Sequence, residues 1–283
     1  MITIVAQNVL HSGLYTPDGG PDPGRWEGQM AAITEHQPDI LLLQEIGRWG
    51  DHNRQPIFRA ERDLGLRMAG YVLRPNGGGT GVMVNPRTVT IQQYEDRYRD
   101  RALRGMGVAV LGVDGLAKPL AVTSAHLCSF SADTAAQEAQ MMVARAYRFG
   151  GLGLVGGDIN HFAANHDDPI PDPYEIPPYN RSARWEQGPD GAWRPNRIVG
   201  QTLHRGGLVD VAPLLAGRTN DRTLLEATGR GRCRVDQFWV TPPLTPAVVG
   251  YERHAHPHSD HALILTRLDP ALVDMEAALS EFV

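Results

Sequence analysis

Short apolar runs alternate with helical patterns from the first residues of the chain. Residues 2–9 and 39–44 are almost continuously apolar, which is typical of strands buried inside a sheet. Residues 26–35 and 56–66 instead show the three-to-four-residue spacing of amphipathic helices. This alternation predicts an α/β protein.

Strand-like segments dominate the rest of the chain. One long helix is predicted among them at 132–149, where Ala, Gln, Glu and Met are frequent. We interpret the whole chain, 1–283, as one α/β domain whose sheets contain antiparallel hairpins and whose helices pack outside. The further predicted strands are 68–73, 81–85, 89–94, 107–113, 120–126, 152–156, 208–211, 234–241, 248–253 and 262–268.

The pattern breaks at residues 161–197. This segment is rich in Pro, Gly, Asp and aromatic residues and has no helical or strand periodicity. A segment of this length without secondary structure is uncommon inside a domain, and is usually functional or disordered. We therefore interpret 161–197 as a long loop insertion.

Composition narrows the choice of partners. The formal net charge is -5, whereas proteins that bind duplex nucleic acid tightly usually have a broad basic surface. Cys128 and Cys233 alone cannot form a disulfide framework. No apolar run is as long as a membrane span, and the first residues show no leader pattern. We expect a cytoplasmic protein with a small or single-stranded substrate, no membrane span and no obligate protein partner.

Polar side chains lie where six apolar runs begin or end. In layered α/β folds, binding sites gather at strand ends. Each residue alone has an ordinary explanation, since Asp and Asn form turns and a lone His is often a hydrogen-bonded core residue. Together they predict a polar pocket at one edge of the packed sheets. The six groups are Gln7-Asn8, Gln44-Glu45, Ser124-Ala125-His126, Gly157-Asp158-Ile159-Asn160, Arg234-Val235-Asp236 and Ser259-Asp260-His261.

The order of these groups resembles the endonuclease/exonuclease/phosphatase superfamily of deoxyribonuclease-like metal-dependent phosphoesterases. The matching elements run from residue 8 to residue 261. The resemblance implies a four-layer α/β sandwich with two central mixed β-sheets flanked by helices. It also implies hydrolysis of phosphate esters with Mg²⁺ or Mn²⁺ as cofactor. The matching elements are Asn8, Gln44-Glu45, His126-Leu127, Gly157-Asp158-Ile159-Asn160, Arg234-Val235-Asp236 and Ser259-Asp260-His261.

The resemblance assigns the cation to one group of these residues. Glu45 would be the primary ligand, with Asn8 and Asp260 beside it, and Mg²⁺ favours such a set of few carboxylates and several waters. Leu10 stands where some family members carry a polar residue, which favours a single cation. Gln237 stands where some relatives have an aromatic residue, outside the main catalytic set.

The remaining matched residues would act on the phosphate. Asp158 would aim the attacking water and Asn160 would position the phosphate. His261, paired with Asp236, would donate a hydrogen bond to the phosphoryl oxygens or transfer a proton. His126 would be a second donor to the developing charge.

Three further features are candidates for substrate binding. Arg184 and Trp185, in 161–197, could hold a phosphate and stack a base, or could pin an ordered surface loop to the core. Ser129 is placed near the substrate phosphate by the resemblance. Alternating arginines could share one strand face and meet an anionic substrate, or merely solvate an edge strand. These arginines are Arg97, Arg99 and Arg101, followed by Arg104.

These features predict a metal-dependent phosphodiesterase or phosphatase, with nuclease and DNA-end processing among the candidate activities. The alternative is a non-catalytic phospholigand-binding protein of the same fold. The presence of the whole catalytic set argues against that alternative, because binding alone does not require it.

Overall fold

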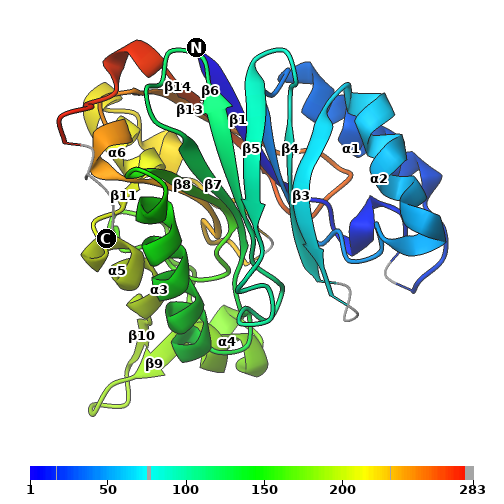
Figure 1. The fold of residues 1–283 in the computed structure, drawn as a ribbon. Coiled ribbons are helices and arrows are strands. Elements are labelled where there is room, and N and C mark those ends of the chain that lie inside the picture. The colour runs from blue at the N-terminus through cyan, green and yellow to red at the C-terminus, as the bar shows by residue number, and fades with distance from the viewer. Residues whose placement is uncertain (17, 75–77, 230, 278–283) are drawn as a thin grey trace.

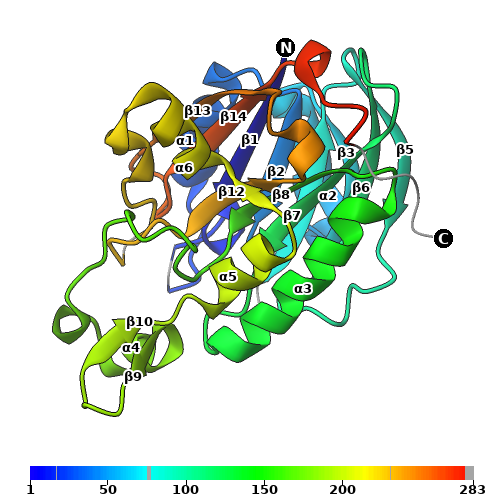
Figure 2. The same cartoon turned by 90° about the vertical axis from the view of Figure 1, so that its left-hand side faces the viewer.

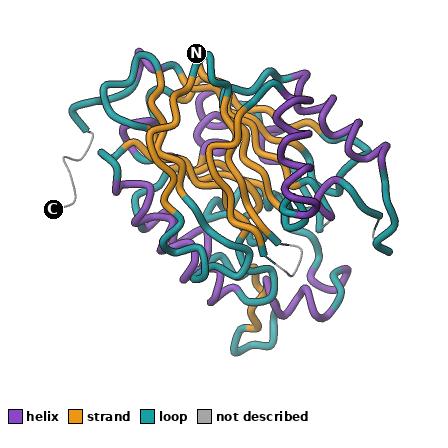
Figure 3. Tube along the Cα trace, turned by 45° about the vertical axis from the view of Figure 1, so that its right-hand side comes forward, coloured by secondary structure: helices purple, strands orange, loops and turns teal. Residues whose placement is uncertain are grey.

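A computed structural model describes residues 1–16, 18–74, 78–229 and 231–277. Two six-stranded mixed sheets lie face to face, and helices cover both outer faces (Figure 1). Figure 3 shows the strands stacked through the middle of the molecule with helices on either side. The architecture is a four-layer α/β sandwich, which confirms the predicted fold.

The first sheet has the strand order β13-β14-β1-β2-β4-β3 and is covered by α1 and α2. Asp22 caps α1 by accepting a hydrogen bond from the Arg25 backbone N–H at 3.1 Å. The strands β1 and β2 are parallel neighbours, so they end at the same edge of the sheet. The elements are β1 (Ile2–Asn8), α1 (Pro23–Glu35), β2 (Ile40–Gln44), α2 (Asp51–Leu64), β3 (Arg67–Leu73), β4 (Gly79–Val84), β13 (Val248–His254) and β14 (Leu263–Leu268).

The second sheet has the order β11-β12-β8-β7-β6-β5, and α3 and α5 cover its outer face (Figure 2). Helix α6 packs against the core that separates the two sheets. In the described part of the chain, none of the helices is long and apolar enough to cross a membrane. The elements are β5 (Val89–Glu95), β6 (Val108–Val113), β7 (Leu120–His126), α3 (Ala132–Arg148), β8 (Leu152–Asp158), α5 (Ile198–Arg205), β11 (Val209–Asp210), α6 (Val211–Thr219) and β12 (Asp236–Val240).

The continuous apolar runs have a simple cause in this architecture. Successive side chains of a strand point to opposite faces of the sheet. Ile4 and Leu42 enter the core between the two sheets. Val5 and Leu43 enter the core under α1 and α2. Both faces of the central strands are therefore buried, and both need apolar residues.

The segment 161–197 contains secondary structure that its sequence did not predict. A helix, α4 (Pro178–Arg184), is followed by a short hairpin of β9 (Trp185–Gln187) and β10 (Trp193–Pro195). These elements lie together at the lower end of the sandwich (Figure 2). They are too short for a helical or strand period to emerge. The helices α5 and α6 were also missed, because α6 contains Pro213 and Gly217 and both helices depend on tertiary packing.

The arginines at 97–104 do not share a strand face, so that expectation is wrong. β5 ends at Glu95 and a series of turns follows, with bonds from the Arg99 N–H to the Asp96 carbonyl and from the Arg101 N–H to the Tyr98 carbonyl. Local ion pairs, such as Arg99 with Asp96 at 3.3 Å, stabilise these turns. Arg101 is exposed within them.

Gly157 in β8 lies close to the neighbouring strand β7 and to β2 of the opposite sheet. Its φ is +124°, and an added Cβ would come within 2.6 Å of the Ala125 carbonyl oxygen and 2.4 Å of Gln44 Nε2. We expect Gly157→Ala to lower the free energy of unfolding by about 1–3 kcal/mol, because both the backbone and the contact would be strained. Urea unfolding would measure the change.

Gly217 offers a matched control in helix α6. Nothing lies within 4 Å of its added Cβ. Gly217→Ala should leave stability unchanged or raise it by up to about 1 kcal/mol, since Ala favours a helix. Equal effects of the two substitutions would contradict the proposed role of Gly157.

Candidate active site

The strand register brings the predicted polar residues to one edge of the sandwich. In the first sheet, the parallel pair β1 and β2 places Asn8 beside the end of β2, directly before Glu45. In the second sheet, β8 lies between β7 and β12, so Asp158 is opposite both His126 and Asp236. Strand ends from both sheets therefore meet in one cluster.

Asn8 joins the two sheets within this cluster. Its side chain is fully buried, and its Nδ2 donates to Glu45 Oε1 at 3.3 Å and to Asp158 Oδ2 at 3.1 Å. The Leu10 N–H donates to Asn8 Oδ1 at 3.0 Å, which fixes the amide. The His11 N–H donates to Glu45 Oε2 at 3.0 Å. Glu45 is thus held in place although its φ of +62° is unusual for a non-glycine residue.

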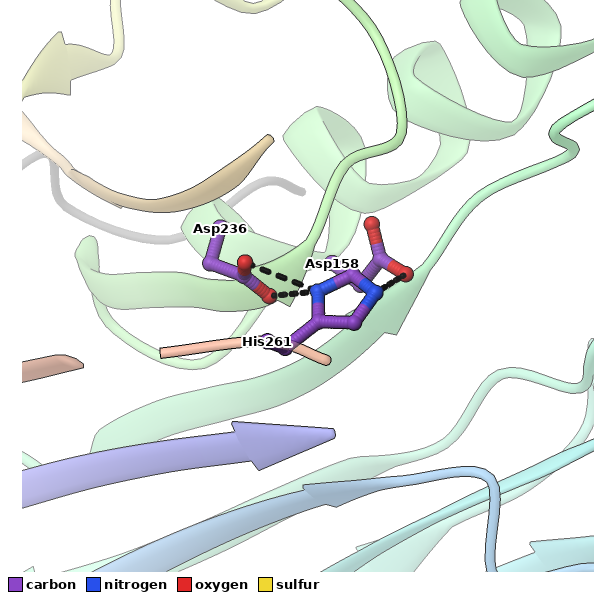
Figure 4. A group of neighbouring side chains, drawn as sticks. All are labelled: Asp158, Asp236 and His261. Atoms are coloured by element: carbon purple, nitrogen blue, oxygen red, sulfur yellow. Dashed lines mark hydrogen bonds and ion pairs between the residues drawn. The ribbon is translucent and has the colours of Figure 1, made fainter. Parts of the chain in front are cut away.

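His261 lies between two carboxylates (Figure 4). Its Nδ1 is 2.9 Å and 3.1 Å from the two carboxylate oxygens of Asp236, and its Nε2 is 3.8 Å from Asp158 Oδ2. Burial disfavours the charged imidazole, but Asp236 and Asp158 outweigh it and raise the pKa of His261 to about 10. At neutral pH the ring is therefore a cation with an N–H at both nitrogens.

His126 is the opposite case. It is 2% exposed, and its Nε2 lies 3.6 Å from Asp158 Oδ2. Burial lowers the pKa of His126 to about 4, although Asp158 works in the other direction. Burial also raises the pKa of Asp158, against the lowering effect of the two histidines. One buried carboxylate thus lies between a neutral and a charged imidazole.

Asn160 connects the cluster to the segment 161–197. Its N–H donates to Asp158 Oδ1 at 2.9 Å, and its side-chain Nδ2 donates to the Leu127 carbonyl at 3.1 Å. The remaining amide oxygen accepts a hydrogen bond from Arg184 Nη2 at 3.1 Å. Arg184, a predicted substrate-binding residue, therefore lies directly at the cluster.

The loop that carries Asp260 is tied to the end of β1. Ser259 Oγ donates to the Asn8 carbonyl at 2.8 Å, and Gln7 Nε2 lies 3.5 Å from the His261 carbonyl. The charge of Asp260 contributes to the raised pKa of His261. This places the predicted third cation ligand at the same edge as the other two.

Thr228 holds the cluster together, although no sequence pattern indicated this role. Its Oγ1 accepts hydrogen bonds from the N–H groups of Val235 and Asp236 at 3.0 Å and 2.8 Å. Its carbonyl accepts from the Ala262 N–H at 2.7 Å. A single loop threonine thus aligns Asp236 with the neighbouring His261.

Three other predicted substrate residues are placed away from these contacts. Trp185 is buried and packs edge-on against Phe162, with ring centroids 5.1 Å apart. Ser129 is partly buried in the bend after β7, and Arg101 is exposed in a turn. Across the described ranges, no hydrogen bond or ion pair joins these three side chains to the cluster. Unlike these three residues, Arg104 acts on the cluster, because its charge helps to lower the pKa of His126.

The donors in the cluster suit a hard divalent cation. Glu45 and Asp260 offer carboxylates, which are ligands that Mg²⁺ and Mn²⁺ prefer. Asn8 now turns its Nδ2 toward Glu45, and its amide would have to rotate to offer Oδ1 as a third ligand. Ligand atoms of Asp158, Asp236 and His261 also lie within 4.8 Å of one another. In that second group, His261 contributes a nitrogen donor, and its Nδ1 is already paired with Asp236 at 2.9 Å. The oxygen donors therefore fit the predicted cofactor better than the histidine-containing group does.

A buried charged group anchors the segment 161–197 beside the cluster. Arg234 Nε donates to Asp168 Oδ2 at 3.0 Å, and its two Nη atoms donate to the Asp210 carboxylate at 3.1 Å and 2.5 Å. The Arg234 side chain is fully buried. Because Arg234 stands two residues before Asp236, this group fixes the segment relative to the cluster.

Asp168→Asn should weaken this anchor. We expect the free energy of unfolding to fall by about 1–3 kcal/mol, because a buried charge opposite Arg234 is lost while Asp210 remains. Asp167→Asn is a matched control, since Asp167 is exposed and paired with exposed Arg222 at 3.1 Å; its effect should stay within about 0.5 kcal/mol. Urea unfolding of both variants measures the difference, and equal effects would refute the anchoring role.

Known proteins share this architecture. The model of the Endonuclease/Exonuclease/phosphatase family matches residues 8–261. A 3′ phosphatase, NExo from Neisseria, in a structure bound to a product DNA hairpin, is similar at 16% identity with a TM-score of 0.64, over 95% of this chain and 100% of that one. A search of curated proteins found no match.

Two further solved structures share the fold. One is TDP2 from D. rerio complexed with a single-strand DNA product, with 14% identity and a TM-score of 0.61 over 95% of this chain and 98% of that one. The other is an AP endonuclease from Archaeoglobus fulgidus, with 18% identity and a TM-score of 0.60 over 95% of this chain and 100% of that one. The family match covers most of the sequence and includes every member of the cluster. The chain belongs to the endonuclease/exonuclease/phosphatase family.

Proposed function

We propose that this protein is a divalent-metal-dependent hydrolase of phosphate esters and that the cluster is its catalytic centre. The observation that carries the proposal is the meeting of two sets of side chains. Asn8 and Glu45 come from one sheet, Asp158 and Asp236 from the other, and His261 precedes β14. A structural role alone would not require so many buried ionisable groups at one edge.

The cation would be held by Glu45, Asn8 and Asp260, and would neutralise charge on the phosphate. Asp158 would orient a water molecule and accept its proton as the water oxygen bonds to phosphorus. The bond from phosphorus to the leaving oxygen breaks in the same displacement. The buried Asp158 is suited to this task because burial raises its pKa, which makes the carboxylate a better proton acceptor.

The charged His261 would stabilise the reacting phosphate. Asp236 holds its Nδ1–H, so that the Nε2–H can donate to a phosphoryl oxygen. Asn160, with Arg184 bonded to its amide oxygen, would contact the phosphate from the other side. Neutral His126 would be a second donor beside Asp158.

The substrate class proposed is a small phosphate ester or the end of a single strand of nucleic acid. The net charge of -5 disfavours tight binding to long duplex. The structures of NExo with a DNA hairpin product and of TDP2 with a single-strand product support DNA-end processing as one form of this activity.

A panel of phosphodiesters, monoesters, nucleotides and oligonucleotides tests the proposal. With Mg²⁺ or Mn²⁺ we expect hydrolysis of at least one class, and excess chelator should abolish it. The alternative function, binding of a phospholigand without catalysis, predicts phosphate binding but no hydrolysis of any member. That second result would overturn the proposed activity.

A further inference from the structure

A separate cavity of about 370 Å³ lies beside the cluster, between helix α4 and the chain at 231–232. We call it the α4 pocket. One wall is apolar, formed by Pro171, Ile176 and Pro177. The polar part of the lining consists of Glu175, Asn180, Arg184 and Arg232. The volume falls within the usual range for small-molecule sites, about 300–1,000 Å³.

Arg184 belongs to both the α4 pocket and the cluster. Its Nη2 donates to Asn160 Oδ1, while its guanidinium lines the pocket. Its Nε is buried and has no hydrogen-bond partner among the described residues. An arginine without a full set of acceptors is suited to an anionic oxygen. A ligand in the pocket would therefore be continuous with a phosphate at Asn160.

The α4 pocket is held in place at two points. Arg234 binds Asp168, which anchors the start of the segment that forms the apolar wall. At the rim, Arg232 pairs with Glu175 at 2.9 Å and so joins the two sides of the pocket. Both partners of the rim pair are exposed, so that pair contributes little to stability but can exchange with a ligand.

We propose that the α4 pocket binds a single nucleoside-sized group attached to the scissile phosphate. The inference rests on the proposed function and adds a substrate preference to it. A flat ring would pack on the Pro171, Ile176 and Pro177 wall, and the Asn180 amide would meet its polar edge. The linking phosphate would lie near Arg184. Through this subsite the protein would favour phosphodiesters that carry a nucleoside over those that do not.

Two diesters with the same leaving group test the inference. The p-nitrophenyl ester of thymidine 5′-monophosphate carries a nucleoside, and methyl p-nitrophenyl phosphate does not. The wild-type protein should show a kcat/KM ratio that favours the thymidine ester by about tenfold or more, as expected for a filled binding pocket. The difference should lie mainly in KM, because the pocket binds the ground state and the transition state alike.

Filling the pocket should remove this preference. Ile176→Trp and Asn180→Phe are each expected to lower the ratio by about tenfold while leaving hydrolysis of the methyl ester within about twofold. Tyr179→Trp is the matched control, because Tyr179 is 73% exposed on the same helix and does not line the pocket. Circular dichroism of all three variants would confirm folding.

The outcomes separate the subsite from the proposed activity. A wild-type ratio near one, or a ratio unchanged in both filling variants, would overturn the subsite while leaving hydrolysis intact. Failure of the wild type to hydrolyse either ester would count against the proposed activity. Calorimetric binding of thymidine 5′-monophosphate in Ca²⁺ then decides the subsite by itself: weaker binding by Ile176→Trp and Asn180→Phe supports it, and equal binding refutes it.

Discussion

Asp158→Asn is expected to reduce kcat for metal-dependent phosphoester hydrolysis by about 10²- to 10⁴-fold, the usual contribution of a positioned general base. Asn has nearly the shape of Asp but cannot accept the proton of an attacking water. The Asp158 carboxylate now accepts hydrogen bonds from Asn8 Nδ2 at 3.1 Å and from the Asn160 N–H at 2.9 Å. The NH₂ group of the new Asn would face one of these two donors, and that hydrogen bond would be lost. Steady-state kinetics on the most active ester measures the loss.

Folding must be kept apart from chemistry in this experiment. Asp158 is 2% exposed, so each preparation needs a circular-dichroism melting curve beside its rate. Asp190→Asn is a suitable control, because Asp190 lies in the exposed β9–β10 hairpin and pairs with Arg194 at 2.7 Å. Its rate should equal that of the wild type. A folded Asp158→Asn protein with a near-normal rate would mean that the catalytic centre lies elsewhere.

Glu45→Gln is expected to cut activity by orders of magnitude at a fixed Mg²⁺ concentration. The substitution removes a negative charge from the proposed primary ligand, while Gln can still accept one of the bonds now donated by Asn8 and His11. Hard cations bind carboxylates far better than neutral amides. Raising the Mg²⁺ concentration should therefore restore part of the rate. The Mg²⁺ concentration that gives half-maximal activity is the quantity to measure.

Glu27→Gln provides the matched control for this charge change. Glu27 is exposed on helix α1 and lies outside the cluster. Its Mg²⁺ dependence should match that of the wild type. If Glu45→Gln also shows an unchanged Mg²⁺ dependence, Glu45 does not hold the cation.

The sequence predicted the two sheets well because their strands are buried on both faces. Runs such as 40–43 are apolar at successive positions, and this pattern leaves few alternatives to a central strand. The clustering of the candidate residues could be predicted for a related reason. The parallel pairs β1–β2 and β7–β8 end at the same edge, so motifs at their ends are brought together by the register.

Other features could not be predicted because tertiary contacts decide them. The helix α6 forms although Gly217 disfavours it, since its apolar side packs on the core between the sheets. Arg97, Arg99 and Arg101 alternate as a strand would, yet local bonds and ion pairs fold this segment into turns.

The electrostatics of the site also needed the structure. Both histidines belong to the matched motifs, but their pKa values are shifted in opposite directions. Burial lowers the pKa of His126, whereas the nearby carboxylates of Asp236 and Asp158 raise the pKa of His261. Thr228 aligns Asp236 through its hydroxyl group, a contact with no sequence pattern. The link from Asn160 to Arg184 spans 24 residues of chain and depends on the unexpected helix α4.

The most direct test of the central claim measures hydrolysis of a p-nitrophenyl phosphodiester by three proteins purified in parallel: wild type, Asp158→Asn and Asp190→Asn. Each is assayed in excess chelator and again after Mg²⁺ is restored. A metal-dependent phosphoesterase centred on the cluster predicts no activity in chelator, recovery with Mg²⁺ in wild type and Asp190→Asn, and a loss of about 10²-fold or more in Asp158→Asn. Full wild-type activity in chelator, or equal rates for Asp158→Asn and wild type, would contradict it.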